Sequence, residues 1–337
     1  MPIVIIKRVS AMIARTRRSL AAAPTPMAGL ALGIASLGWC WENAGQFDGR
    51  LQLLGAAIAA VLLLVLTFKF LIHPRLLWQD LAHPVVGSVV PTYAMGTMVV
   101  SKAVGLLAPT LGQGLWLFAV IIHLVFLTTF VWHRARAFEI HHMVPSWFVP
   151  PVGIIVADVA YPGGPFASLA TGLLWFGMAC YGLMLPLMLY RLIFSHEVPD
   201  AAKPTIAILA APASLSLAGY LTVSQDPSLL LVAVLLGIAV LMTGIIYLAF
   251  IKLLRLPFSP GYAAFTFPLV IGATALFKVS HLLSQWPQAA RYAEQLHQLA
   301  YLELGVATLV VGYVALRYLM FFLPVVQDDL PGQPARR

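Results

Sequence analysis

The chain has 337 residues, of which 61% are hydrophobic and only 9% are charged, and its mean hydropathy is +0.92. A soluble globular domain of this length does not have such a composition, so the sequence predicts an all-α membrane protein with many spans. The formal net charge of +8 does not indicate nucleic-acid binding, because the basic residues are dispersed among short loops. Two cysteines, Cys40 and Cys180, are too few for a disulfide framework or a metal set, and no metal site is expected.

The chain opens with a basic stretch that holds five Lys and Arg residues. A basic stretch before an apolar run is typical of a cleaved signal peptide, but here the run continues past Trp39 without a cleavage context. We therefore expect a cytoplasmic N-terminal segment over residues 1–21, which is either an interfacial helix or unstructured. A ten-helix transmembrane domain over residues 22–325 and a cytoplasmic tail over 326–337 follow.

Ten apolar segments are long enough to cross a hydrocarbon core of ~30 Å as helices. They are expected at residues 22–41, 51–72, 84–107, 113–132, 145–162, 165–191, 204–223, 228–251, 261–283 and 300–323. The connecting loops alternate in charge, and sixteen of the 20 Lys and Arg residues fall on one side. The positive-inside rule then places this side in the cytoplasm. We therefore expect a protein of the inner membrane with both termini in the cytoplasm.

Prolines occur mainly in the odd-numbered segments, inside them or at their cytoplasmic mouths. Pro91, Pro151, Pro212 and Pro268 recur at intervals of 60, 61 and 56 residues, which is the length of one helical hairpin. We expect five parallel hairpins in a ring, with kinked odd helices lining a central pore and straighter even helices outside. The alternative is that prolines are simply common in membrane helices, but it does not explain the difference between odd and even segments.

The ninth segment, within residues 259–282, indicates most clearly what the odd helices do. Pro268 removes a backbone N–H and clashes with the preceding turn, so the helix is expected to kink or break there. Broken backbone is tolerated at membrane depth only where protein or a water-filled cavity satisfies the freed groups. The segment is therefore predicted to line a pore.

Four stretches carry a family resemblance: HPVVGSVVPTYAMGTM from His83, VPSWFVPPVGIIVADV from Val144, LAAPASLSLAGYL from Leu209 and AAFTFPLVIGA from Ala263. They resemble the tellurite-resistance/dicarboxylate transporter family, which includes TehA-like proteins, plant slow anion channels and the yeast malic acid transporter. The resemblance covers all ten segments, and the order, spacing and proline positions carry it together. It implies a homotrimer in which each protomer has its own five-helix anion pore. Tellurite resistance would be a consequence of transport.

The resemblance also implies that a phenylalanine of the ninth segment plugs the pore, and the matching residue here is Phe267. A ring in a narrow pore excludes water and offers an ion no dipoles, so a rotamer change is enough to gate it. Phe265 lies roughly 200° around a regular helix from Phe267, so we expect only Phe267 to face the lumen. The alternative is that Phe267 faces lipid or packs between helices, like most of the 18 phenylalanines.

Charged and hydroxyl side chains within the odd segments are further candidates. Lys102, Lys278 and Asp158 lie late in their segments, and they predict an outer vestibule where the lysines attract anions and Asp158 pairs with one of them. The alternative for each is snorkelling to the interface. Glu303 opens the tenth segment and is expected at the interface. Possible pore-lining hydroxyls, which could equally hold helices together, are Ser88, Thr92, Thr97, Ser101, Ser214, Ser216, Thr266 and Thr274.

Catalytic and nucleotide-binding motifs do not occur in the sequence, so we expect neither an enzyme nor a cofactor. His133, His141 and His142 flank one loop, but their spacing matches no usual ligand pattern. The expected function is an anion channel or carrier for small inorganic or carboxylate anions, in contact with membrane lipids and not with nucleic acid. The alternatives are a proton-coupled transporter of malate-like C4-dicarboxylates and a membrane sensor that never conducts.

Overall fold

The computed structural model describes residue 12 and residues 14–328, and every regular element in this part of the chain is helical. The rest of the expected terminal segments lies outside the described residues. Residues Ala14–Ala22, within the expected basic segment, form a helix that is bent by 74° from the first apolar helix, α2 (Met27–Trp41).

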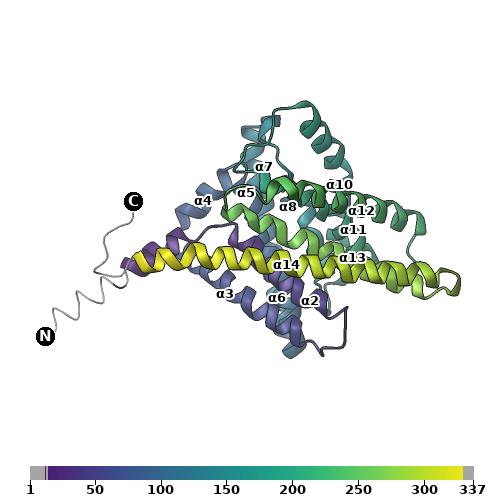
Figure 1. Ribbon diagram of the computed structural model, residues 1–337. Helices are drawn as coiled ribbons and strands as arrows, with labels where there is room; N and C mark the ends of the chain where they lie inside the picture. Colours follow the sequence, from purple (N-terminus) through teal and green to yellow (C-terminus); the bar gives the residue numbers. More distant parts are fainter. Residues whose placement is uncertain (1–11, 13, 329–337) are drawn as a thin grey trace.

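The even-numbered segments are long, unbroken helices. They are α3 (Arg50–Ile72), α7 (Pro109–Arg136), α10 (Ala167–Phe194), α12 (Leu229–Leu253) and α14 (Ala290–Asp328). Figure 1 shows α14, in yellow, running along the molecule beside α13 and α2, against which it packs. At 39 residues, α14 begins ten residues before the segment expected at 300–323.

The odd-numbered segments are broken into shorter helical pieces. The third is α5 (Val86–Val89) and α6 (Thr92–Leu107), the seventh is η4 (Lys203–Ala210) and α11 (Ala211–Val223), and the ninth is η5 (Pro260–Phe265) and α13 (Thr266–Ser284). The fifth consists of η2 (Pro145–Phe148), α8 (Val149–Val152), η3 (Gly153–Ile155) and α9 (Val156–Val159). Shorter elements are α4 (Pro74–Ala82), η1 (Ile140–His142) and η6 (Pro287–Ala289).

Eight helices of the described residues are long and apolar enough to cross a membrane, and the bent pair that ends in α2 makes a ninth. The remaining expected segment is represented by the shorter apolar stretch Pro145–Val159. An integral membrane protein is therefore confirmed, while the count of ten spans stays a prediction. Helix α4 was not predicted, because it lies in a stretch that we had assigned to a loop.

The breaks occur where the prolines are, but not in the form expected. Pro268 is the third residue of α13 rather than an interior residue, because the chain is a 3-10 helix up to Phe265 and becomes α-helical at Thr266. Pro212 has the same place near the start of α11, and Pro91 precedes α6. A proline in the first turn of a helix removes an N–H that has no intrahelical partner, so the break costs little.

Burial separates the two sets of segments. The buried share of the apolar stretch is 67%, 78% and 89% for the third, seventh and ninth segments, and 28–39% for the five even helices. Among the odd segments, α2 packs against α6 and α13, α9 packs against α6 and α11, and α11 packs against α13. The even helices carry the large exposed apolar side chains, for example Leu183, Leu230 and Leu309. The odd segments are therefore the inner set and the even helices the outer set.

Candidate functional site

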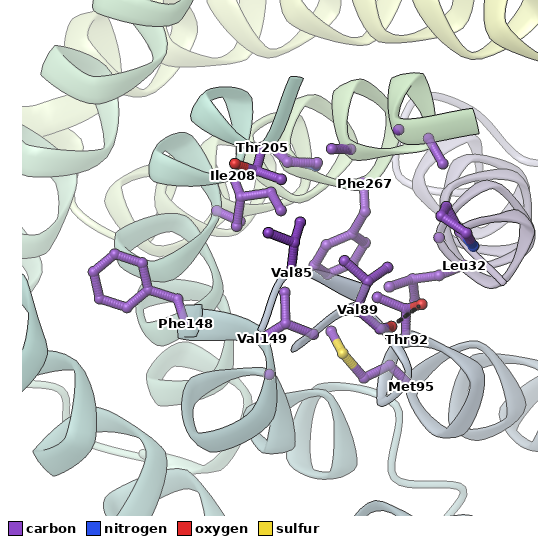
Figure 2. Close-up of a pocket in the computed structure, with 18 of the residues that line it drawn as sticks. Leu32, Val85, Val89, Thr92, Met95, Phe148, Val149, Thr205, Ile208 and Phe267 are labelled. Atoms are coloured by element: carbon purple, nitrogen blue, oxygen red, sulfur yellow. Dashed lines mark hydrogen bonds between the residues drawn. The ribbon is translucent and has the colours of Figure 1, made fainter. Parts of the chain in front are cut away.

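A cavity of about 340 Å³ lies among the N-terminal ends of the inner segments. Each of the five inner segments contributes to its wall, and no outer helix of the described residues does. Figure 2 shows the ring of Phe267 projecting into this cavity beside Val85 and Val89. The wall is apolar except for the hydroxyl groups of Thr92, Thr205 and Ser259, and no charged side chain of the described residues lines it.

A second cavity, of about 10 Å³, lies further along the inner segments. This volume holds about one water molecule. Its wall again comes from the inner segments alone and consists of Ser36, Trp39, Val99, Val156, Val159, Leu215, Phe267, Ile271 and Thr274. Phe267 and Leu215 line both cavities, so their side chains form the partition between a wide space and a narrow one.

The two phenylalanines at the start of the ninth segment have different surroundings. Phe267 is 8% exposed and borders the cavities. Phe265 is fully buried, away from them, with its ring centroid 5.2 Å from that of Phe250 and 4.7 Å from that of Tyr262. Figure 2 labels only the first of the two among the cavity residues.

Thr266, between these two phenylalanines, fixes α13 to α2. Its hydroxyl donates to the carbonyl of Ala263 at 2.7 Å and lies 3.2 Å from that of Gly29. A Cβ atom at Gly33 would lie 2.4 Å from the Thr266 Oγ1, so the two helices touch here only because residue 33 is glycine. Thr266 thus acts in helix packing and does not line either cavity.

The other hydroxyl candidates are mostly bonded within or between helices. Ser88 and Ser146 share a hydrogen bond of 2.7 Å, and Thr97 and Ser214 donate to carbonyls one turn back, those of Tyr93 and Ala210. Among the candidates, Thr92 lines the wide cavity and Thr274 lines the narrow one. Thr205, the other threonine of the wide cavity, was missed although it directly follows Pro204 at the mouth of an inner segment.

Only two of the four expected kink prolines line the wide cavity. Pro212 and Pro268 line the wide cavity, and Pro91 and Pro151 do not. Three further prolines, Pro24, Pro26 and Pro260, lie at the mouths of inner segments and are part of the same wall.

The three charged residues expected in the outer vestibule do come together. Asp158 lies within electrostatic range of both Lys102 and Lys278. The Lys102 Nζ donates to the carbonyl of Val159 at 3.0 Å and lies 4.1 Å from the centroid of the Trp39 ring. Lys278 lines a separate pocket of about 270 Å³ toward the C-terminal ends of the inner segments.

The expected ion pair of Asp158 is not formed. The side chain is buried, neither carboxylate oxygen has a hydrogen-bond partner, and no ion pair within 4.0 Å joins it to a described residue. Snorkelling is not the explanation either, because Asp158 is 1% exposed.

A polar network at the mouth of the wide cavity was missed. Lys69 of α3 is one of the sixteen basic residues expected in or beside the cytoplasmic loops, but it is 5% exposed. Its Nζ donates to the Ala23 carbonyl at 2.8 Å and to the Thr25 hydroxyl at 2.9 Å, and lies 3.7 Å from Asp80 of α4. The network therefore holds the chain that enters α2, where Pro24 and Pro26 form part of the cavity wall.

Glu303 also differs from expectation. Because α14 begins at Ala290, Glu303 is several turns inside the helix rather than at its start, and it is 5% exposed. It packs on the outer side of α13, where a Cβ atom at Gly272 would lie 2.4 Å from its Oε1.

One group of side chains among the described residues has the composition of a metal site. The ligand atoms of Glu139, His141 and His142 lie within 4.8 Å of one another on and beside η1. The carboxylate is 3.0 Å from the His141 Nε2 and 3.9 Å from the His142 Nε2. Glu139 and His141 are exposed, and exposed acidic groups of this kind are common without a metal ion.

Comparison with known proteins gives one family match and two similar sequences. The family described as voltage-dependent anion channel matches residues 24–322. An uncharacterized transporter of Methanocaldococcus jannaschii is 26% identical over 235 residues, which is 62% of this chain and 68% of the relative. A second uncharacterized transporter of the same organism is 27% identical over 245 residues, covering 61% of this chain and 69% of the relative.

Proposed function

Because the chain belongs to the voltage-dependent anion channel family, we propose that it passes small anions along the axis of its inner segments, with Phe267 as the gate. The observation that carries this proposal is the position of one ring. Phe267 borders both the wide and the narrow cavity, and these two cavities follow one another along the same five segments. Movement of that ring is the smallest change that would join them.

The contacts among the inner segments support a closed ring around this line. The sequence of packed pairs runs from α2 to α6, α9, α11 and α13 and returns to α2. The outer helices follow their inner partners as hairpins, for example α3 on α2 and α14 on α13. We propose five hairpins around one pore in each protomer, and a homotrimer in the inner membrane with both termini in the cytoplasm.

The lining supports passage of anions rather than tight binding. The wide cavity has no charged side chain among the described residues, so an anion there is neither held by a lysine nor repelled by a carboxylate. Lys102 and Lys278, beyond the narrow cavity, supply positive charge at the opposite end of the path. Such an arrangement attracts an anion without trapping it in the middle, as conduction requires.

The test is anion flux in proteoliposomes for the wild type and Phe267→Ala, with chloride, nitrate and malate in turn. We expect the variant to raise flux by roughly tenfold or more, equivalent to removing about 1.4 kcal/mol from the barrier. Phe265→Ala is the matched control, because it removes the same ring two residues away without touching a cavity. Flux that Phe267→Ala leaves unchanged would contradict the gate, and no flux from any folded variant would favour the sensor.

Transport of a C4-dicarboxylate is the second candidate, and the outer lysines favour it. Two ammonium groups near one buried carboxylate match a substrate that carries two negative charges better than one that carries a single charge. Malate flux that exceeds chloride and nitrate flux in the same liposomes would select this candidate. A pH gradient that drives malate uptake would show proton coupling.

A further inference from the structure

The carboxylate of Asp158 is an unusual feature of the outer end of the path. It is 1% exposed, and both of its oxygens are buried without a hydrogen-bond partner. A buried carboxylate without a partner is costly, and it persists only where the structure supplies compensating charge or a proton.

The groups that face Asp158 come from four neighbouring elements. Lys102 of α6 and Lys278 of α13 are the charged groups that act on it within the described part of the chain. From α10 and α11 it meets apolar or small residues: a Cβ atom at Gly219 would lie 3.2 Å from Asp158 Oδ2 and 2.7 Å from Leu174. The titration of Asp158 therefore depends on burial and on these two lysines.

The two lysines differ in the contacts that their ammonium groups make. Lys102 is bonded to the Val159 carbonyl and lies over the Trp39 ring, and both of those residues line the narrow cavity. Lys278 lines the outer pocket and makes no hydrogen bond to another described residue. An anion that arrives through the outer pocket would therefore meet Lys278 first and Lys102 at the edge of the narrow cavity.

We propose that Asp158 determines how strongly the outer end of the path holds an anion, because its carboxylate competes with the permeating anion for the positive charge of Lys102 and Lys278. A proton on Asp158 removes this competitor and leaves both lysines to the anion. The inference rests on the proposed path and adds a specificity-determining residue to it.

The proposal has a reciprocal consequence. An anion bound at the lysines offsets the positive charge that favours the ionised form of Asp158, so it promotes binding of a proton there. By linkage, the factor by which the proton strengthens anion binding equals the factor by which the anion strengthens proton binding.

The experiment measures nitrate binding to the full chain in detergent, from the nitrate dependence of its unfolding temperature, at about pH 8 and about pH 5. Nitrate is the probe because its own charge does not change in this range. For the wild type we expect the apparent Kd to fall roughly 5- to 150-fold on acidification, the usual range of such coupling. Asp158→Asn should bind nitrate tightly at both pH values, with no pH dependence.

Three controls keep the result specific. Glu303→Gln changes a buried carboxylate outside the cavity walls, and His281→Gln changes a titratable residue of the outer pocket, so both should keep the wild-type pH dependence. Asp158→Glu retains the carboxylate and should keep it too, and it provides a second variant if Asp158→Asn fails to fold.

The inference is wrong if Asp158→Asn keeps the wild-type pH dependence, if either control abolishes it, or if nitrate binds the wild type at neither pH. Binding is read without transport, so the outcome is separate from that of the flux experiment. A pH-linked binding site in a protein without flux would remove the channel and keep the role of Asp158.

Discussion

The inner segments and the outer helices of this chain differ in the one property that a membrane restricts most, the continuity of the backbone. The outer helices run unbroken for 23 to 39 residues and remain largely exposed. The third, seventh and ninth segments are 67–89% buried and are interrupted, the third at Pro91 and the seventh and ninth by a change from 3-10 helix to α-helix. Lipid cannot satisfy a free N–H or C=O group, so breaks are confined to segments that protein surrounds.

Lys69 provides the strongest test of this difference, because its side chain extends from an outer helix to the start of an inner segment. Lys69→Met would remove the donor to the Ala23 carbonyl and the positive charge beside Asp80, which would keep only its hydrogen bond from Thr25. Removal of one member of a buried ion pair costs about 3 kcal/mol, the lower end of the range because Asp80 is 24% exposed. Thermal unfolding in detergent would measure this loss.

The matched control is Lys252→Met at the end of α12, where the side chain is exposed and unlinked to an inner segment. We expect it to change stability by less than about 0.5 kcal/mol. Equal losses in the two variants would show that Lys69 has no special role.

Two glycine substitutions compare the packing of inner and outer helices, with a smaller expected effect on stability. Gly33→Ala places a methyl group 2.4 Å from the Thr266 hydroxyl between two inner segments, and such overpacking costs about 1–3 kcal/mol. Gly237→Ala on α12 meets no atom within 4 Å, and alanine favours a helix, so stability should not fall. Equal unfolding temperatures for these two variants would contradict the close contact of α2 with α13.

The smallest expected effect concerns pH at the turn before α5. The His83 Nδ1 accepts hydrogen bonds from the backbone N–H groups of Val85 at 3.2 Å and Val86 at 3.1 Å, which requires this nitrogen to be unprotonated. Burial, and then the charge of Arg134, lowers the pKa of His83 below its usual value. Between the lowered pKa and the unfolded value near 6.5, the unfolded chain binds more protons, so stability falls as pH falls through this window.

His83→Ala should flatten this part of the pH profile, with a loss of about 0.5 kcal/mol at neutral pH. The comparison is the unfolding temperature of both proteins between about pH 7 and about pH 5. An unchanged slope in the variant would assign the pH dependence to another group.

Much of the architecture followed from the sequence because it depends on hydropathy and on proline. Helix content, most segment limits and the inner position of the proline-bearing segments could all be predicted. The side chains facing the cavities could not, because a 3-10 turn advances each residue by about 120° and an α-helix by about 100°. The direction of Thr97 or Ser214 after such a change cannot be extrapolated from the residues before it.

The sequence also did not predict which charged side chains are buried. Lys69 and Glu303 were expected in water or at the interface, because the sequence does not show where α4 packs or where α14 begins. Their burial depends on neighbours far away in the chain: Asp80 and Ala23 for the lysine, and Gly272 for the glutamate.

The narrow cavity sets a further condition on any opening of this chain. With room for about one water molecule, it cannot receive an anion together with its hydration shell. On the proposed path, rotation of the Phe267 ring would therefore remove one barrier and leave a second at this narrow space. Full opening would also move apart Val99, Val156 and Ile271, on three different segments, so the rate of passage would depend on a collective movement of the ring of helices as well as on one side chain.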